Sequence, residues 1–147
     1  PYKNRIEHVK EIGVVFGQRS QLWWDVPVID SFELLKDIYS ISTPKYNNNL
    51  EELTELLNLK ELLKTPTRQL SLGQRMRCEI AASLLHSPRI LFLDEPFKGL
   101  DEETLNTVQN YLLENTKGLT VIMVTHQIEE AKALGAEILN LKNGAID

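Results

Sequence analysis

SPRILFLDEP, residues 87–96 of a chain of 147 residues, is a short apolar run that ends in two acids. Four apolar residues, 90–93, follow Pro88 and Arg89 and are followed directly by Asp94 and Glu95. An apolar run of this length bounded by prolines is typical of a fully buried strand. Because an unpaired carboxylate is costly to bury, we expect the two acids at the open end of the strand. A hydrated metal ion that accompanies a nucleotide is the partner that this arrangement favours.

The composition restricts the class of protein. A hydrophobic content of 42% in 147 residues is sufficient for one globular domain. The net charge of -5 argues against a nucleic-acid partner, which usually requires a basic patch. Cys78 is the single cysteine, so no disulfide framework is possible, and we expect it to be buried in a protein of a reducing, cytoplasmic compartment. No apolar run has the length of a membrane span, and no signal peptide is recognisable.

The hydrophobic pattern predicts strands that alternate with helices. Strands are expected at 12–16, 90–94 and 119–125, and ILNLKNGAID at the C-terminus predicts a further strand with an Asn-Gly hairpin turn. Three pairs of residues have the spacing of a capping box and predict helix starts: Asp30 with Glu33, Asn49 with Glu52, and Ser71 with Gln74. The first of these helices is expected at about 31–41, and residues 42–49 are expected to be a polar loop. Asp101 is expected to cap a further helix, and a last helix is expected to end at Gly135.

Such alternation predicts an α/β layer with a parallel sheet, and the helices concentrated between residues 30 and 87 predict an inserted helical region. Ligands of such sheets bind beyond the carboxyl ends of the strands. Polar residues follow three of the predicted strands: Gln18, the pair Asp94 and Glu95, and His126. We therefore expect these side chains to converge on a phosphate and a metal ion.

Five motifs resemble, in order and spacing, the nucleotide-binding domain of ABC transporters: VVFGQ (14–18), LSLGQ (70–74), ILFLDEP (90–96), GLD (99–101) and VTH (124–126). In that family they are the Q-loop, the signature motif, the Walker B strand, the D-loop and the switch histidine. The resemblance covers nearly the whole chain. It implies a P-loop NTPase-like (RecA-like) parallel sheet core over 1–18 and 88–147, with a helical subdomain over 19–87. The segment FGQRSQLWWDVPVIDSFELL (16–35) is also similar to bacterial exporter ATPases of the multidrug and antibiotic-resistance type.

The sequence departs from the family pattern in two places. Leu72 stands in the signature motif where the family usually has glycine, although Ser71 and Gly73 are present. The Walker A loop, which needs glycines followed by Lys-Ser or Lys-Thr, is missing, because none of the seven glycines precedes a lysine. In the family this loop precedes the Q-loop strand, so we expect it upstream of Pro1 and expect the domain in this chain to be incomplete at its N-terminus.

The resemblance implies a role for each of four residues at the strand ends. Asp94 would hold Mg²⁺, and Glu95 would be the general base that polarises the attacking water. His126 would contact the γ-phosphate of ATP, and Gln18 would respond to the γ-phosphate and the metal. The other histidines, His8 and His86, are expected to be surface or helix-end residues.

Four further residues would bind ATP across an interface between two such domains. Ser71, Gly73, Gln74 and Asp101 would face the ATP held by the second ATPase domain of a head-to-tail dimer. Ser71 and Asp101 are also expected to be helix N-caps, and a helix N-terminus is an anion site. Trp23 and Trp24 have two interpretations of equal weight: a core aromatic with a residue at its rim, or a docking surface for a membrane subunit.

The function that the resemblance implies is that of an ATP-binding and ATP-hydrolysing subunit of an ABC transporter of the exporter type, peripheral at the inner face of the cell membrane. Its cofactors would be ATP and Mg²⁺, and its partners a second ATPase domain and an integral membrane subunit. One alternative is a soluble ABC-type ATPase that acts on ribosomes or DNA, but residues 19–69 lack the long coiled coil of DNA-repair members. A non-catalytic interaction module is disfavoured because Glu95 and His126 are both in place. The sequence upstream of Pro1 is the most useful further observation, because a Gly-rich loop ending in Gly-Lys-Ser or Gly-Lys-Thr is expected there and ribosome-acting members usually carry two such domains in one chain.

Overall fold

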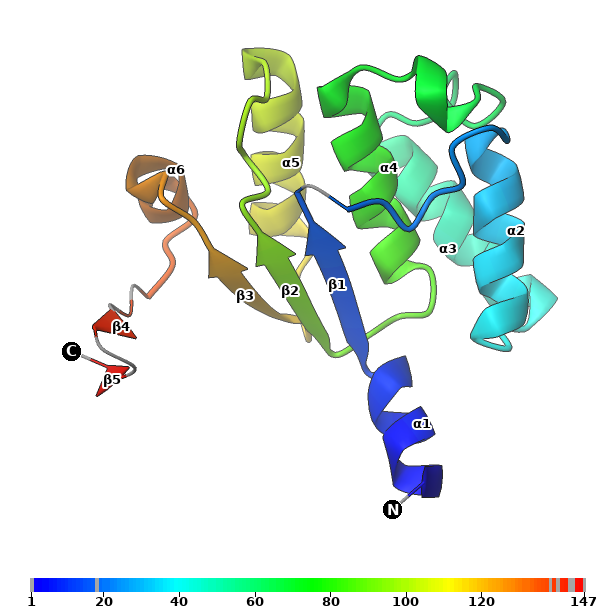
Figure 1. Ribbon diagram of the computed structural model, residues 1–147, viewed down its shortest axis with the longest axis horizontal. Coiled ribbons are helices and arrows are strands. Elements are labelled where there is room, and N and C mark those ends of the chain that lie inside the picture. The colour runs from blue at the N-terminus through cyan, green and yellow to red at the C-terminus, as the bar shows by residue number, and fades with distance from the viewer. Residues whose placement is uncertain (1, 18, 138, 140, 143–144, 147) are drawn as a thin grey trace.

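A computed structural model describes residues 2–17, 19–137, 139, 141–142 and 145–146. Its centre is a parallel sheet of three strands in the order β1–β2–β3, namely β1 Ile12–Phe16, β2 Ile90–Asp94 and β3 Thr120–Val124 (Figure 1). The three predicted strands are confirmed, and β2 lies between the other two. In the described part of the chain β3 forms one edge of this sheet.

The two faces of the sheet differ in what covers them. Side chains alternate between the faces of a strand, and Val15, Leu91 and Leu93 form one core with residues of the helices behind the sheet. The opposite face carries apolar side chains that remain exposed: Phe16, Phe92, Ile122 and Val124. The expectation that the strands at 90–94 and 119–125 are fully buried is therefore wrong, because every second side chain points to the uncovered face.

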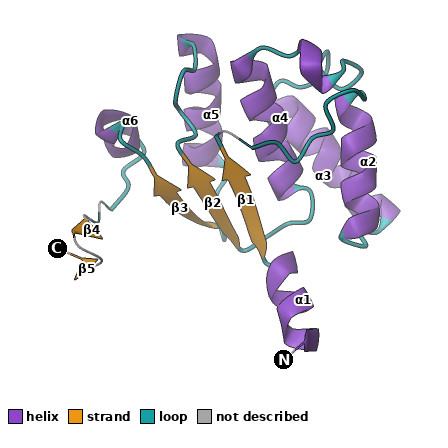
Figure 2. Ribbon diagram, viewed as in Figure 1, coloured by secondary structure: helices purple, strands orange, loops and turns teal. Residues whose placement is uncertain are grey.

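Helices fill most of the remaining chain. Between β1 and β2 lie α2 Val28–Ile38, α3 Thr43–Leu56, a 3-10 turn at Thr67–Gln69 and α4 Leu72–Leu84. After β2 come α5 Glu102–Glu114 and α6 Ile128–Ala133, and a helix that the sequence did not predict, α1 Tyr2–Lys10, precedes β1. Figure 2 shows α2, α3 and α4 grouped beside β1, as expected for a helical region inserted between the two strands, although its boundaries at 19 and 87 remain predictions.

The end of the described chain contains two short strands, β4 Leu141–Lys142 and β5 Ala145–Ile146, which pair antiparallel. This pairing agrees with the predicted hairpin, whereas its Asn-Gly turn lies outside the described residues. Gly135 follows α6 with a positive φ of 66°, which glycine adopts without strain, and so ends that helix as predicted. None of the helices in the described part of the chain is both long and apolar enough to span a bilayer.

Two predicted helix starts are wrong, and tertiary contacts explain both. α2 begins at Val28 because the N–H groups of Val28 and Ile29 donate to the carbonyls of Thr65 and Leu63, so no capping box at Asp30 is needed. α3 begins at Thr43, within the expected loop 42–49, which places Asn49 inside the helix. The Asn49 amide donates to the Leu85 carbonyl and the Ser87 hydroxyl, and thereby joins α3 to the end of α4.

α4 packs closely on β1 and carries the one acid among the buried residues that the structure describes, Glu79. A Cβ atom added at Gly13 of β1 would lie 2.6 Å from the Ser83 carbonyl oxygen, so a glycine is required where the two elements meet. Glu79 accepts hydrogen bonds from the Ser20 hydroxyl and, at 3.2 Å, from the Gln21 N–H. Burial raises the pKa of the Glu79 carboxyl, and these hydrogen bonds oppose the rise. Cys78, next to it, is buried as predicted.

The uncovered face of the sheet predicts that the chain 1–147 self-associates in solution, because exposed apolar sheet surface and strand edges pair with other chains. Ile122→Lys places a charge on this face at the edge strand and is expected to reduce the average mass measured by light scattering. Leu113→Lys is the matched control, since Leu113 is exposed on α5 and lies away from this face. A monomeric unmodified chain, or an equal effect of both substitutions, would contradict the prediction.

Candidate functional site

Main-chain hydrogen bonds join the carboxyl ends of the three strands. The N–H of Gly17, just after β1, donates to the Asp94 carbonyl at 3.0 Å, and the Glu95 N–H donates to the Val124 carbonyl of β3 at 2.8 Å. Asp94 ends β2 and is exposed. The acid pair therefore lies at the open end of the central strand, as the sequence predicts.

Glu95 has an unusual backbone conformation and a well-defined side chain. Its φ is +49°, in the left-handed region where residues other than glycine are uncommon and which often marks a functional position. Its carboxylate accepts hydrogen bonds from the main-chain N–H of His126 at 3.0 Å and from the Thr125 hydroxyl at 3.3 Å. The structure thus brings together Glu95 and His126, which the sequence singled out, and adds Thr125, to which no role was assigned although it lies within the VTH motif.

The geometry leaves both side chains able to act on a ligand. The Glu95 side chain is 21% exposed and each of its oxygens keeps an unused lone pair after these two hydrogen bonds. The His126 side chain is 98% exposed, with Nε2 3.6 Å from the nearer Glu95 oxygen. A carboxylate held from two sides with acceptor capacity to spare can orient a water molecule and take its proton.

The N-terminus of α4 is closed by the predicted capping box. The Ser71 hydroxyl accepts the Gln74 N–H at 3.2 Å, and the Gln74 side-chain oxygen accepts the Ser71 N–H at 2.9 Å. The amide oxygen of Gln74 is thereby engaged within the helix. The Ser71 hydroxyl hydrogen and the remaining N–H groups of the first turn are available to an anion.

The signature segment packs against the segment that contains the GLD motif. A Cβ atom at Gly73 would lie 2.5 Å from the Thr104 hydroxyl oxygen of α5, so a side chain at position 73 has no room. A Cβ atom at Gly99, where φ is +72°, would lie 2.9 Å from a methyl group of Leu72. Leu72, the departure from the family pattern, therefore packs over Gly99 and remains partly exposed.

Asp101 caps α5, as predicted. Its carboxylate accepts the Thr104 N–H at 2.7 Å. Hydrogen bonds from the Thr104 backbone and side chain hold the pKa of Asp101 below its ordinary value. Asp101 is consequently an ionised, exposed residue at a helix N-terminus.

The candidate residues form two groups on the same side of the fold. Glu95 and His126 lie at the carboxyl ends of the strands, and Ser71, Gly73 and Asp101 lie at the starts of α4 and α5. In Figure 1 both helices begin at the upper end of the view, toward which the strands point. No hydrogen bond or ion pair joins the two groups among the residues that the structure covers. Gln18 lies outside the described residues.

The side chains at the strand ends fit a metal ion that is coordinated mostly by water and by the phosphates of a substrate. The described residues contain no cluster of three or more metal-binding side chains. Mg²⁺ does not need one, because it keeps several waters and binds through one or two carboxylates together with substrate phosphates. An exposed carboxylate at a strand end, such as Asp94, meets that requirement.

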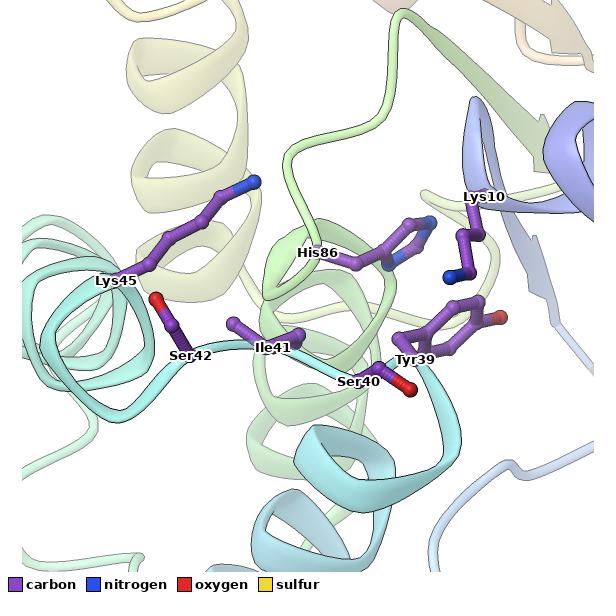
Figure 3. Close-up of a pocket in the computed structure, with 7 residues that line it drawn as sticks. All are labelled: Lys10, Tyr39, Ser40, Ile41, Ser42, Lys45 and His86. Carbon is purple, nitrogen blue, oxygen red and sulfur yellow. The ribbon is translucent and has the colours of Figure 1, made fainter.

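A cavity of about 420 Å³ lies elsewhere, around His86 (Figure 3). His86 was expected at the surface or at a helix end. It does follow α4, but it is buried, because its ring stacks on Tyr39 with centroids 4.0 Å apart and its Nε2 is 2.9 Å from the Ile12 carbonyl oxygen. Burial lowers the pKa of His86. Since Ile12 begins β1, this cavity is at the amino end of the sheet, away from the acid pair.

Trp23 and Trp24 are both exposed, by 57% and 54%. The interpretation in which one of them is a core aromatic is therefore wrong. The main chain holds both in place, since the Trp23 N–H donates to the Ser31 hydroxyl and the Trp24 carbonyl accepts the Arg68 N–H, each at 3.0 Å. Two adjacent indole rings on an ordered loop form an apolar surface beside α2.

Comparison with known proteins finds a family model described as "ABC transporter" that matches residues 2–98. Similar proteins include the aliphatic sulfonates import ATP-binding protein SsuB of Bacillus subtilis, 41% identical over 70% of this chain and 41% of the relative. The sulfate/thiosulfate import ATP-binding protein CysA of Neisseria meningitidis is 34% identical over 96% of this chain and 42% of the relative. ABC transporter G family member 20 of Dictyostelium discoideum is 33% identical over 88% of this chain and 18% of the relative. The chain thus spans less than half the length of each of these relatives.

Solved structures agree on the fold. CbiO1 of Clostridium perfringens, part of the ABC transporter complex CbiONQ, superposes with a TM-score of 0.78 and 27% identity over 91% of this chain and 54% of that chain. A structure described as the ATP-binding subunit of an ABC transporter, 20% identical, superposes with a TM-score of 0.77 over 89% of this chain and 55% of that chain. The expected P-loop NTPase-like fold is therefore confirmed.

Gly73→Ala should destabilise the protein by about 1–3 kcal/mol, the usual cost of overpacking, because the new methyl group would meet Thr104. The free energy of unfolding, measured with denaturant, tests this. Thr104→Ala removes the hydroxyl and methyl groups that the new side chain would meet. The double variant should therefore lose less stability than the sum of the losses in the two single variants. An unchanged stability in Gly73→Ala would show that the α4–α5 contact is loose.

Proposed function

Because the chain belongs to the ABC transporter family, we propose that it forms part of an ATP-hydrolysing domain that drives transport through a membrane partner. The observation that supports this most directly is Glu95, whose carboxylate is held at the end of β2 by Thr125 and His126 and still has acceptor capacity. ATP would lie beyond the strand ends, where ligands of parallel α/β sheets bind.

In the proposed reaction Glu95 is the general base. Its carboxylate accepts a hydrogen bond from the water that attacks the γ-phosphate, and takes the proton as the new P–O bond forms and the bond from the γ-phosphorus to the bridging oxygen breaks, with ADP as the leaving group. The Thr125 hydroxyl and the His126 N–H keep the carboxylate in one orientation. The exposed His126 imidazole is proposed to donate to the γ-phosphate, and Gln18 is proposed to contact the same phosphate.

Asp94 is proposed to hold Mg²⁺ together with the phosphates of ATP. When bound, Mg²⁺ would neutralise negative charge on those phosphates. The fit rests on the exposed carboxylate at the end of β2 and on the preference of Mg²⁺ for few protein ligands.

A second copy of the domain is proposed to complete the ATP site. The Ser71 hydroxyl, the Gly73 N–H, the side-chain amide of Gln74 and Asp101 would face the ATP of that copy in a head-to-tail dimer. Support comes from the N–H groups of the first turn of α4 that the capping box leaves free, and from the contact that holds this turn against the start of α5. The anion-binding character of a helix N-terminus suits a phosphate at this position.

The membrane partner and the export direction are also proposals. The resemblance of residues 16–35 to exporter ATPases favours export, whereas SsuB and CysA are import proteins by name. Transport by the full-length protein with its membrane subunit, in vesicles that expose the ATPase outward, distinguishes the two. Solute accumulation inside such vesicles on addition of ATP corresponds to export, and ATP-driven loss of preloaded solute corresponds to import.

Glu95→Gln in the full-length protein should lower ATP turnover by about 10²- to 10⁴-fold, the usual contribution of a general base. Glutamine keeps the size of the side chain but cannot take the proton. Steady-state phosphate release measures turnover, and equilibrium binding of MgATP should persist. Glu114→Gln is the matched control, an exposed acid at the end of α5 that should not matter. Near-normal turnover in Glu95→Gln would remove Glu95 from this role.

Replacing Trp23 and Trp24 together by alanine should uncouple transport from hydrolysis if these side chains dock the membrane subunit. Reconstituted transport is expected to fall at least about tenfold, because aromatic residues often dominate the energy of interfaces. ATP turnover by the ATPase protein alone should stay within about twofold of normal. The control Ile38→Ala removes another exposed apolar side chain, on α2, and should leave transport intact. Full transport by the double tryptophan variant would exclude this surface from docking.

A further inference from the structure

Glu79 is a buried acid on a helix whose neighbouring residues are apolar. It is 3% exposed, and Cys78, Ile80 and Ala81 beside it are also buried. No lysine, arginine or histidine in the described part of the chain forms an ion pair with it. A buried carboxylate without a cationic partner costs stability relative to an apolar residue of similar size. The hydrogen bonds that it accepts, with a smaller Coulombic contribution from Arg75, compensate part of this cost.

Those hydrogen bonds come from one short segment, residues 20–22. The Ser20 hydroxyl donates to one carboxylate oxygen of Glu79 and the Gln21 N–H donates to the other. The Gln21 side chain continues the connection, since its amide donates to the Val14 carbonyl of β1 at 2.7 Å. Charged acceptors form stronger and more directional hydrogen bonds than neutral ones. Glu79 thus fastens this segment to α4, which is itself packed on β1 at Gly13.

Both ends of this connection lead to residues proposed to contact ATP. Ser20 follows Gln18 by two positions in the sequence. On the other side, α4 runs without interruption from its cap at Ser71 to Leu84, so Glu79 lies roughly 12 Å along the helix from the signature residues. A helix of this length transmits a displacement along its axis as a rigid rod.

We propose that Glu79 is a positioning residue that fixes the segment after Gln18 to the signature helix, so that an ATP-dependent displacement of either is passed to the other. The proposal rests on the ATP-dependent function proposed above. Glu79 itself does not touch the nucleotide. Its removal should therefore lower kcat for ATP hydrolysis by about fivefold or more, a typical coupling between sites, while the KM for ATP stays within about twofold.

Amide hydrogen exchange on the full-length protein, with and without MgATP, tests the proposal directly. In the unmodified protein MgATP should slow exchange both in peptides covering residues 19–22 and in peptides covering 71–77. In Glu79→Ala, exchange at 19–22 should rise about tenfold or more without ATP, as expected on loss of hydrogen bonds to a charged group. MgATP should then protect residues 71–77, which would contact ATP directly, and no longer protect residues 19–22, which depend on Glu79 for their connection to α4.

Two further variants keep the proposal testable if Glu79→Ala does not fold. Ser20→Ala removes the Ser20–Glu79 hydrogen bond from the exposed side, and should also abolish the coupled protection of the two segments by MgATP. Glu79→Gln keeps an acceptor oxygen for the Gln21 N–H and an amide that can donate to Ser20, and should retain most of the coupled protection. In the Ser20→Ala and Glu79→Ala double variant the loss in kcat should be no greater than in Glu79→Ala alone.

Ser83→Ala is the matched control for a change within α4. The Ser83 hydroxyl is buried too, but it donates to the Ile80 carbonyl of its own helix and makes no connection to another element. Coordinated protection of both segments in Glu79→Ala or Ser20→Ala would overturn the proposal, as would an equal loss in Ser83→Ala. If the unmodified protein shows no response to MgATP in either segment, the proposed ATP-dependent function fails instead, which separates the two outcomes.

Discussion

The pairing of β2 with a parallel neighbour on each side is the constraint on which the rest of the structure depends. The register sets Phe16, Asp94 and Val124 side by side, so the residues that follow them in each strand must leave the sheet at the same place. A shift of one residue in any strand would turn its core side chains outward and carry its last polar residue away from the others. The packing of the core and the assembly of the candidate site therefore have a single geometric origin.

Glu95 shows how the chain uses this edge. Its left-handed backbone turns the chain sharply after Asp94, so that two consecutive acids leave β2 in different directions, and β3 holds the second one through Val124, Thr125 and His126. The helix starts at Ser71 and Asp101 add electropositive N–H groups on the same side of the fold. In the proposed dimer the carboxylates at the strand ends would suit the metal ion of one MgATP, and the amide dipoles at the helix starts would suit the phosphates of the ATP held by the other copy.

Local chemistry made part of this predictable from sequence. The capping box at Ser71 and the cap at Asp101 involve residues three apart, and the strands show as apolar runs. The features that could not be predicted depend on contacts between distant segments. Glu79 binds Gln21 across 58 positions, and nothing in its local pattern distinguishes it from a solvated acid on a helix. Asn49 was interpreted as a helix cap because its partner, the Leu85 carbonyl, is equally remote. Thr125 could have been found, since a hydroxyl beside the expected histidine is within reach of the acid pair.

The position of β1 has a consequence for how the protein is made. Residues 17–89 separate β1 from its partner β2. The three helices in this interval can form through hydrogen bonds between residues close in sequence, whereas β1 cannot pair until β2 has been synthesised. At ordinary rates of synthesis β1 leaves the ribosome roughly 4–16 s before β2 is complete. During that interval its main-chain groups lack their sheet partner, and the non-local closure that follows is the slow kind of folding event. The interval favours early formation of the helical region, which would hold β1 against α4 until β2 arrives.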